Sequence, residues 1–281
     1  MISIQELLRE GQALLESAGV PDPELDAAYL LAEALRAPRL TLCIRKNDPV
    51  PESAEKAFRD ALQRRAGREP LQYILGSADF YGRSFSVGPG VLIPRCDTEA
   101  LCEHALALVP RGKAFRVLDL CTGSGILAVT IALERPQSRV TACDLSEEAL
   151  IFARQNAKAL KADVTFWQGD LFDALPKGDV YDLIVSNPPY IPSPLLPSLQ
   201  DEVRREPALA LCGGKDGMDF YRRIRDGIFS RLAPGGSLCL EGGDDQIGQI
   251  AELFSPYFQE TACFDDLSGH PRGVCGKGFR P

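Results

Sequence analysis

The sequence of 281 residues has few of the side chains that metal centres use. It contains only two histidines, His104 and His270, and none of its nine cysteines stands in a Cys-x-x-Cys pair. A zinc site of the usual spacing is therefore not expected, and no metal is predicted. The cysteines are odd in number and scattered through apolar stretches. We therefore expect reduced thiols that pack as small hydrophobic side chains, as in a cytoplasmic protein.

Long hydrophobic runs are also missing from the chain. No apolar stretch reaches the roughly 18 residues that a membrane span requires. Residues 1–6 lack the basic start and the apolar core of a secretory signal. These absences predict a cytoplasmic protein with no membrane partner, and the composition of 45% hydrophobic and 25% charged residues is ordinary for a globular chain.

An excess of positive charge is the third absence, since the net charge is −8 and the pI is about 5.0. A free-standing protein that binds double-stranded DNA is more often basic. We therefore expect no direct nucleic-acid partner. The acidic balance suits a partner with a basic surface, although it is also common among soluble proteins.

The N-terminal quarter of the chain has a residue pattern typical of helices. Leucines recur at helical spacing through residues 1–68, and prolines divide the stretch into segments. The pattern predicts a helical domain over 1–70 with no titratable cluster, serving either to stabilise the protein or to dock a macromolecular substrate. Residues 71–95 alternate aromatic residues with glycines, which predicts strands joined by turns and a β-hairpin linker over 71–98.

From residue 99 to 281 strands and helices alternate. This predicts an α/β domain with a doubly wound, mostly parallel sheet. Strands are expected at 115–121, 139–144, 163–168, 180–186 and 236–241, helices at 124–134, 146–160, 217–232 and 244–256, and a final pair of strands near 258–264 and 273–279. The proline-rich segment 191–216 is predicted to be a functional loop, because long loops in compact domains usually are.

The run Asn187-Pro188-Pro189-Tyr190 follows the apolar strand predicted at 180–186. In open α/β sheets ligands bind beyond the carboxyl ends of the strands, so these residues are expected at the ligand site. The Asn187 amide can donate and accept, the prolines present carbonyls without N–H groups, and Tyr190 offers a ring face. Such a set suits a flat, uncharged –NH2 group, although the same letters also suit a simple turn.

A glycine loop, Asp119-Leu120-Cys121-Thr122-Gly123-Ser124-Gly125, joins an earlier strand to a helix. Glycines there allow close backbone approach, and free N–H groups at the helix start favour polar ligand atoms. With Asp144 about 20 residues on, the spacing also matches a dinucleotide-binding fingerprint, so a nicotinamide dehydrogenase is an alternative. Asp119, Asp144 and Asp170 favour S-adenosylmethionine instead, because a carboxylate can bind its ammonium group or its ribose. Helix capping is the structural alternative for Asp144 and Asp170.

Taken in this order, the glycine loop, the two later acids and Asn187 to Tyr190 resemble class I S-adenosylmethionine-dependent methyltransferases that act on planar –NH2 groups. Four further segments narrow the resemblance to the PrmC/HemK family: Glu69 to Gly76, Leu92 to Glu99, Arg205 to Leu211 and Gly217 to Asp219. The resemblance covers nearly the whole chain, including a small N-terminal helical domain, a hairpin linker and a methyltransferase domain over 99–281.

The resemblance implies methyl transfer to the side-chain amide nitrogen (N5) of the glutamine in the Gly-Gly-Gln motif of class I peptide chain release factors. The cofactor is then S-adenosyl-L-methionine and the product S-adenosyl-L-homocysteine, and the enzyme is expected to be a monomer. Asn187, Pro188, Pro189 and Tyr190 would bind the glutamine amide and carry the catalysis. The cofactor residues would be Asp119, Cys121, Thr122, Gly123, Ser124, Gly125, Asp144, Asp170, Leu171 and Asn187.

The chain departs from this family at two positions, where Cys121 replaces the usual glycine and Cys96 the usual proline. Cys121 is expected to require an ordinary backbone conformation, with a slight change in the first turn of the loop. Two further functions stay open at this point. One is adenine-N6 methylation of nucleic acid, since similar Asn-Pro-Pro-Tyr loops occur in such enzymes, and the other is a non-catalytic module that binds a release factor or the ribosome.

Overall fold

The computed structural model describes residues 2–281 and divides the chain into two compact units. The first comprises the residues up to Ser77 together with Gln200–Arg205, and the second comprises Ala78–Leu199 and Glu206–Pro281. Within residues 2–281, no helix is both long enough and apolar enough to cross a membrane.

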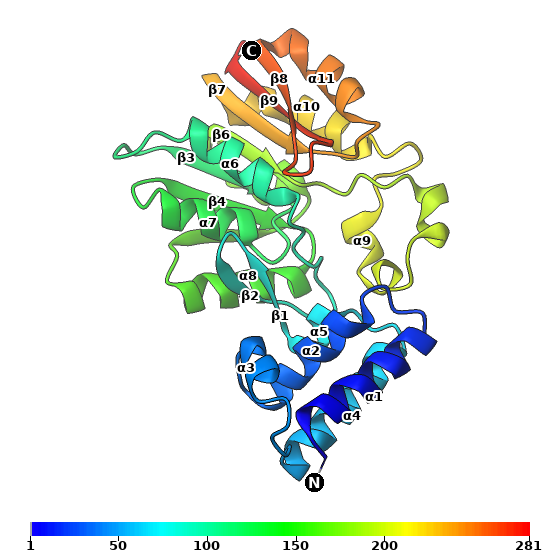
Figure 1. Cartoon of the computed structure of the whole chain (residues 1–281). Helices are drawn as coiled ribbons and strands as arrows, with labels where there is room; N and C mark the ends of the chain where they lie inside the picture. Colours follow the sequence, from blue (N-terminus) through cyan, green and yellow to red (C-terminus); the bar gives the residue numbers. More distant parts are fainter. Residues whose placement is uncertain (1) are drawn as a thin grey trace. The chain divides into compact units, whose positions relative to one another are not determined.

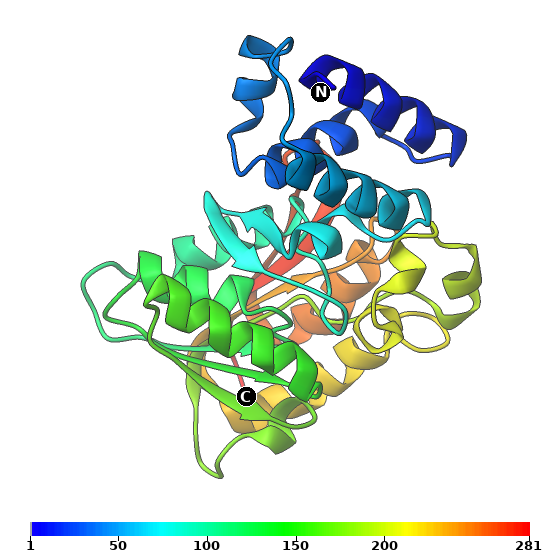
Figure 2. The same cartoon turned by 90° about the horizontal axis from the view of Figure 1, so that it is seen from below.

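The first unit is a bundle of helices whose apolar faces share one core (Figures 1 and 2). Its helices are α1 (Ile4–Ser17), α2 (Pro23–Ala34), α3 (Arg39–Ile44), α4 (Glu52–Ala66) and α5 (Leu71–Leu75), with a 3-10 turn, η3, at Val203–Arg205. The α1 helix begins in a capping box, in which Ser3 and Glu6 satisfy each other's backbone N–H groups. Leu7, Leu31 and Phe58 are fully buried and join the first, second and fourth helices.

A buried ionic cluster holds this bundle, so the expectation of no titratable cluster is wrong. Arg65 on α4 pairs with Asp26 on α2 at 2.6 Å and with Glu202 at 2.8 Å. Arg68 also pairs with Glu202, at 2.6 Å. Glu202 therefore ties the segment Gln200–Arg205 to the helices. The sequence does not indicate this link, because the partners lie far apart along the chain.

The strands predicted over 71–95 are present only in part, since the stretch begins with the helix α5. Pro70 precedes this helix, and Gly76 ends it with a left-handed backbone at φ 73°. Pro is well suited to a helix start and Gly to its end. A hairpin of β1 (Ser77–Phe80) and β2 (Arg83–Ser86) then follows as a separate two-stranded sheet.

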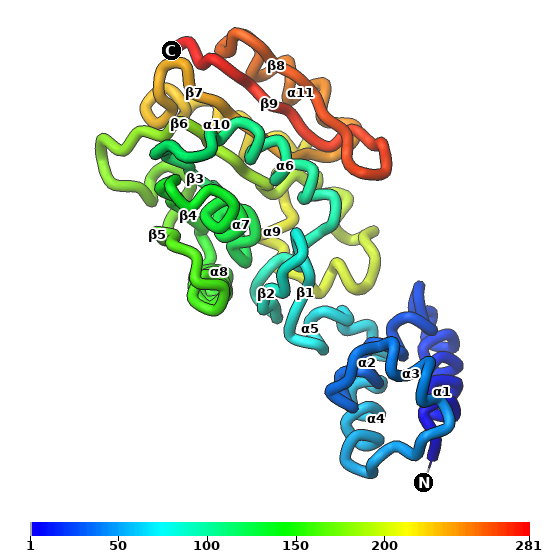
Figure 3. Tube along the Cα trace, turned by 60° about the vertical axis from the view of Figure 1, so that its left-hand side comes forward, coloured from blue at the N-terminus to red at the C-terminus, as the bar shows by residue number. Residues whose placement is uncertain are grey.

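The second unit is built on a seven-stranded sheet of order β5-β4-β3-β6-β7-β9-β8 (Figure 3). Strands β3 to β7 run parallel, and β9 pairs antiparallel with both β7 and β8. The bounds are β3 (Arg116–Leu120), β4 (Arg139–Asp144), β5 (Val164–Gln168), β6 (Tyr181–Ser186), β7 (Leu232–Glu241), β8 (Phe258–Asp265) and β9 (Pro271–Phe279). The prediction of an α/β fold with a mostly parallel sheet is confirmed.

Helices cover both faces of this sheet and create two cores. The α6 (Thr98–Leu108), α7 (Ile126–Glu134) and α8 (Glu147–Leu160) helices pack on one face, whereas α10 (Asp219–Arg231) and α11 (Ile247–Phe254) pack on the other (Figure 1). Neighbouring residues of a strand point to opposite faces, so Leu183 and Val185 belong to the first core and Ile184 to the second. The short elements are α9 (Ala208–Leu211), η1 (Leu171–Ala174), η2 (Ser193–Ser198) and η4 (Ser255–Tyr257).

One cysteine pair departs from the expectation of nine reduced thiols. Cys239 and Cys275 lie directly opposite each other in β7 and β9, with Cα atoms 4.4 Å apart, and are joined in a disulfide. The pairing arises because adjacent antiparallel strands bring directly opposed residues within reach of one another. The other seven cysteines are free.

Candidate functional site

A cavity of about 930 Å³, counting its open mouth, lies at the carboxyl ends of the parallel strands in the second unit. The chain leaves β3 toward β4 on one side, while β6 lies on the other side of β3. Loops that leave such a switch point diverge and create a crevice. The cavity is lined from the loops after β3, β4, β5 and β6, from the segment before α6, from residues 207–210 and from Phe220.

The loop after β3 forms one wall. Cys121, Thr122, Gly123 and Ser124 line the cavity, and Gly125 begins α7 with φ 83°. A Cβ atom at Gly125 would lie 3.1 Å from the Cβ of Ala153, so both the tight contact with α8 and the positive φ favour glycine there.

Asp119 supports this loop from behind rather than lining the cavity. Its Oδ2 accepts hydrogen bonds from the Thr122 hydroxyl at 2.6 Å and from the Ala128 N–H at 3.1 Å. The side chain is fully buried, and burial raises its pKa to about 7. Direct contact between Asp119 and a cofactor stays a prediction.

Cys121 adopts a left-handed backbone with φ 57°. The expectation of an ordinary conformation is therefore wrong, because the loop keeps the geometry that glycine provides most easily. For a residue with a side chain this conformation costs about 1–2 kcal/mol. Burial raises the pKa of the Cys121 thiol well above its usual range, which keeps the sulfur protonated.

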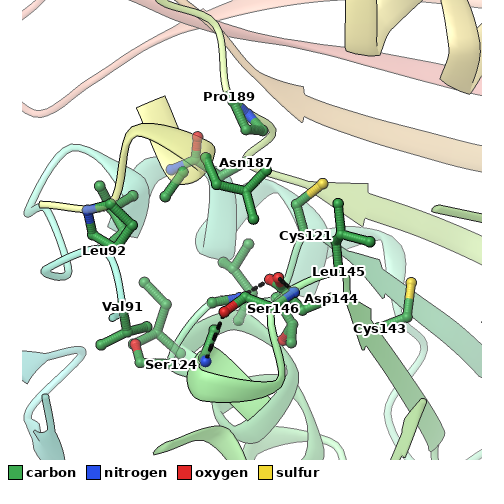
Figure 4. A pocket seen from close by; sticks show the side chains of 18 of the residues that line it. Val91, Leu92, Cys121, Ser124, Cys143, Asp144, Leu145, Ser146, Asn187 and Pro189 are labelled. Atoms are coloured by element: carbon green, nitrogen blue, oxygen red, sulfur yellow. Dashed lines mark hydrogen bonds between the residues drawn. The ribbon is translucent and has the colours of Figure 1, made fainter. Parts of the chain in front are cut away.

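Asp144 at the end of β4 faces the glycine loop. Its Oδ2 accepts the Gly123 N–H at 2.9 Å and its Oδ1 accepts the Ser146 N–H at 2.9 Å. Ser146, not Asp144, caps α8, with its hydroxyl accepting the Ala149 N–H. Burial raises the pKa of Asp144. Figure 4 shows Asp144 and Ser146 across the cavity from Asn187.

Asp170 and Leu171 line the same cavity after β5. Leu171 has φ 48°, and Gly169 just before them has φ 151°. Asp170 pairs with Arg223 of α10 at 2.7 Å, and each of these side chains is about half exposed. The ring of Phe220, on the same helix, also lines this part of the cavity.

Asn187 and Pro189 line the cavity from the loop after β6, and Figure 4 shows Asn187 near Cys121 of the glycine loop, whereas Pro188 and Tyr190 are not among the lining residues. The Asn187 Nδ2 donates a hydrogen bond to the Thr98 Oγ1 at 3.2 Å. Tyr190 is fixed through its carbonyl, which accepts from the Gln246 Nε2 at 3.0 Å, and burial raises its pKa to about 12. With the Nδ2 of Asn187 bonded to Thr98, the Oδ1 is the other, accepting end of this cavity-lining amide.

The buried Glu206 joins the two remaining walls of the cavity, which are the segment before α6 and residues 207–210. Glu206 accepts the Ile93 N–H at 2.9 Å through Oε2 and the Arg95 guanidinium through Oε1. It follows that residues 207–210 and 93–95 meet at the rim of the cavity. The sequence marks both segments through the resemblance, but it assigns them no contact.

Sequence analysis missed several residues of the cavity. Thr98, Leu145, Ser146 and Phe220 line it without having been predicted as site residues. Leu145 and Ser146 directly follow Asp144, so their place after a parallel strand could have indicated them. Thr98 and Phe220 start helices, and no spacing pattern distinguishes them from capping and core residues. In residues 2–281, no group of three or more His, Cys, Asp or Glu side chains could hold a metal ion.

Comparison with known families and proteins gives matches over both units. Residues 6–76 match the PrmC N-terminal domain, and residues 98–193 match the methyltransferase small domain. A release factor glutamine methyltransferase of Geobacter sulfurreducens is 43% identical over 278 residues, covering 98% of this chain and 96% of its own length. The protein of the same name from Bordetella pertussis is 45% identical over 260 residues, covering 92% of this chain and 96% of its own.

Solved structures resemble the chain in fold alone. A methyltransferase of Pyrococcus furiosus aligns with a TM-score of 0.54 and 20% identity, over 72% of this chain and 91% of that one. The 16S rRNA N2 G1207 methyltransferase of T. Thermophilus, in complex with AdoMet and guanosine, aligns with a TM-score of 0.50 and 19% identity, over 72% and 49%.

Proposed function

The chain belongs to the family of release factor glutamine methyltransferases, and from this premise we propose how its cavity performs that reaction. The enzyme transfers a methyl group from S-adenosylmethionine to the side-chain amide nitrogen, N5, of the glutamine in the Gly-Gly-Gln motif of class I release factors. The observation that carries the proposal is the Asn187 amide, whose Nδ2 is engaged by Thr98 and whose Oδ1 can accept an N–H in the cavity.

The residues of the cavity suit S-adenosylmethionine by their chemistry. Gly123 and Ser124 line the cavity at a helix start, where polar ligand atoms are favoured. The Asp144 carboxylate offers acceptors for ribose hydroxyls, and Leu171 with Phe220 offers apolar surface for a base. Our assignment of the cofactor side of the cavity also includes Cys121, Thr122, Gly125 and Asp170. Asp119 supports the glycine loop from behind through its hydrogen bonds.

The chain's own residues orient the substrate amide. When bound, S-adenosylmethionine supplies a methyl group on a positively charged sulfur. Asn187 Oδ1 and the Pro188 carbonyl accept hydrogen bonds from the two N–H groups of the amide, and Pro189 and Tyr190 shape the slot. As the methyl group is transferred, the thioether product leaves and the amide nitrogen loses one proton to water. These acceptors stabilise the positive charge that grows on the amide nitrogen, and preorganised groups of this kind lower barriers by about 3 kcal/mol each. Fixing the nitrogen in line for attack contributes further, up to roughly 7–11 kcal/mol in favourable cases.

We also propose a partner and a cellular setting for the enzyme, which its family membership supports. The protein substrate is a class I release factor, which the acidic chain of net charge −8 attracts if the factor's surface is basic. The helical domain, residues 1–70, serves in docking. The 71–98 segment links it to the methyltransferase domain, 99–281. The enzyme works in the cytoplasm as a monomer, for which light scattering should give a mass near 30.6 kDa.

Transfer of labelled methyl groups tests the proposal. The purified chain is incubated with labelled S-adenosylmethionine and a class I release factor, and in parallel with the same factor whose Gly-Gly-Gln glutamine is changed to alanine. Label on the first protein and none on the second is the expected result. Label on neither, with cofactor binding intact in calorimetry, would contradict the substrate assignment. Label on added nucleic acid would instead favour adenine methylation.

A further inference from the structure

A buried carboxyl lies beside the substrate-binding amide and has no role in the reaction as described so far. Glu241 is the last residue of β7, and Leu240 pairs with Ser186 of β6 in the parallel register. The next positions in this register are Glu241, which ends β7, and Asn187, which is the first residue after β6. Glu241 is 1% exposed, and within residues 2–281 its Oε2 has no hydrogen-bond partner.

A buried carboxyl is costly, so its surroundings explain why it is retained. Burial raises the pKa of Glu241 to about 7, while hydrogen bonding from the Thr98 and Asn187 side chains and the charge of Arg272 oppose the rise. Arg272 is itself held by Asp266 at 3.1 Å and by Asp97 at 3.3 Å. Glu241 thus combines an attractive charge from Arg272 with hydrogen bonds from the Thr98 and Asn187 side chains.

These neighbours determine the polarity of the Asn187 amide, that is, which of its two ends faces the cavity. An ionised carboxylate can only accept hydrogen bonds, whereas an asparagine amide has a donor end and an acceptor end. With Glu241 and the Thr98 Oγ1 on the inner side, the Nδ2 must turn inward, as its 3.2 Å bond to Thr98 requires. The Oδ1 then turns toward the cavity, so that the Asn187 amide itself offers the substrate an acceptor and no donor.

We propose that Glu241 is a positioning residue that fixes the polarity of the Asn187 amide, so that the cavity selects an –NH2 group and rejects a carboxylate. The inference rests on the proposed function and adds a reason for its specificity. A glutamate in place of the substrate glutamine presents only acceptors to Asn187 Oδ1, and two buried acceptors facing each other are unfavourable.

Exchange of the two polar groups provides a sharp test. Glu241→Gln introduces an amide that can present either end, so the Asn187 amide is free to turn over. Asn187→Asp places two carboxylates face to face. In the double variant Glu241→Gln/Asn187→Asp, the glutamine donates to one aspartate oxygen and leaves the other as an acceptor in the cavity. The double variant therefore keeps the net charge of the original pair. It also again presents an acceptor, and no donor, at position 187.

The measurements are turnover on the release factor, its KM, and cofactor affinity by calorimetry, at about pH 8, where Glu241 is ionised. We expect Glu241→Gln to lower kcat about tenfold or more with cofactor affinity within about twofold. We expect the double variant to exceed Asn187→Asp by about tenfold. Glu252→Gln, on the exposed face of α11, is the control and should match the original enzyme.

A double variant no faster than Asn187→Asp, or a Glu241→Gln enzyme at full turnover, would overturn the inference. If Glu241→Gln fails to fold, Thr98→Val replaces it, because it removes the oxygen that receives the Asn187 Nδ2. A loss of kcat of about tenfold with unchanged cofactor affinity then supports the inference, and full turnover overturns it. An original enzyme that does not methylate the factor would instead contradict the proposed function.

Discussion

The Glu206 carboxylate accepts the backbone N–H of Ile93 at 2.9 Å and so joins two segments of the chain that are 113 residues apart. Glu206 is buried, and it also receives the Arg95 guanidinium. Because both donors belong to the segment that leads into α6, this carboxylate positions one rim of the cavity against residues 207–210.

Removal of this carboxylate should destabilise the second unit and loosen the rim. Glu206→Ala leaves the buried Ile93 N–H without its partner, which costs about 1.5–3 kcal/mol for a bond to a charged group. Urea denaturation measures the free energy of unfolding, and calorimetry measures cofactor affinity. Glu260→Gln, on an exposed part of β8, is the control. An unchanged unfolding free energy in Glu206→Ala would show that the contact contributes nothing.

Asn187→Ala should abolish most of the turnover while leaving the cofactor in place. The variant loses the acceptor that aligns the substrate amide, and loss of one preorganised group lowers kcat about a hundredfold or more. We expect cofactor affinity to stay within a few-fold, because other residues make the cofactor side of the cavity. Single-turnover kinetics and calorimetry separate the two quantities. Full turnover in the variant would rule out the mechanism.

Gly125→Ala should impair the glycine loop. The alanine would have to keep the left-handed φ of 83°, and its Cβ would lie 3.1 Å from the Ala153 Cβ. Gly178→Ala is a matched control, since Gly178 has φ 89° but nothing within 4 Å of an added Cβ. We expect Gly125→Ala to lose about 1–3 kcal/mol more stability than the control and about tenfold in cofactor affinity. Equal losses in the two variants would mean that the contact with α8 does not matter.

The left-handed backbone at Cys121 should carry a measurable cost. Cys121→Ala and Cys121→Gly both remove the sulfur, but only the second removes the Cβ that clashes at φ 57°. We expect Cys121→Gly to be about 1 kcal/mol more stable than Cys121→Ala in thermal or chemical denaturation. If Cys121→Ala proves the more stable of the two, the loop does not hold this conformation in solution.

The stability of the protein should depend on pH through two buried carboxyls. Burial raises the pKa of Asp119 from 3.8 to about 7 and that of Glu241 from 4.5 to about 7. Between about pH 4 and pH 7 the folded protein therefore holds protons that the unfolded chain has released. Each group therefore contributes on the order of 3 kcal/mol to the free energy of unfolding in acid. This contribution is lost as the pH rises through about 7.

Asp119→Asn isolates one of these contributions. Other carboxyls, such as Asp182 beside Arg116, have lowered pKa values and act in the opposite direction. The comparison is therefore the difference in unfolding free energy between the variant and the original protein, measured across the same pH range. This difference should shift in favour of the variant as pH rises from about 4 to about 7. A difference that does not vary with pH would refute the assigned pKa.

Most of the sheet and the motifs at its strand ends can be predicted from the amino-acid sequence. Apolar runs separated by turn residues mark β3, β4, β5 and β6 within a residue or two. For the central strands β3 and β6 the reason is burial on both faces, which requires continuous hydrophobic stretches, whereas the edge strand β5 has no buried residue. The predicted start of β7 is wrong, since the strand begins at Leu232 rather than at residue 236. Pro234 and the glycines after it are typical of a turn, which is why the sequence pattern predicts a later start. Since parallel strands end at one edge, the order of the motifs placed Asn187, Asp144 and the glycine loop around one cavity.

The side chains that support that cavity could not be predicted, because they come from segments remote in sequence. Thr98 reaches Asn187 across 89 residues, Glu206 reaches Ile93 across 113, and Glu241 joins the site through strand register. The Cys239–Cys275 pair and the Arg65 cluster arise in the same way. The physical reason is common to all of them. Periodicity records whether a residue is buried, but the partner of a buried polar group is set by the packing of segments remote in sequence.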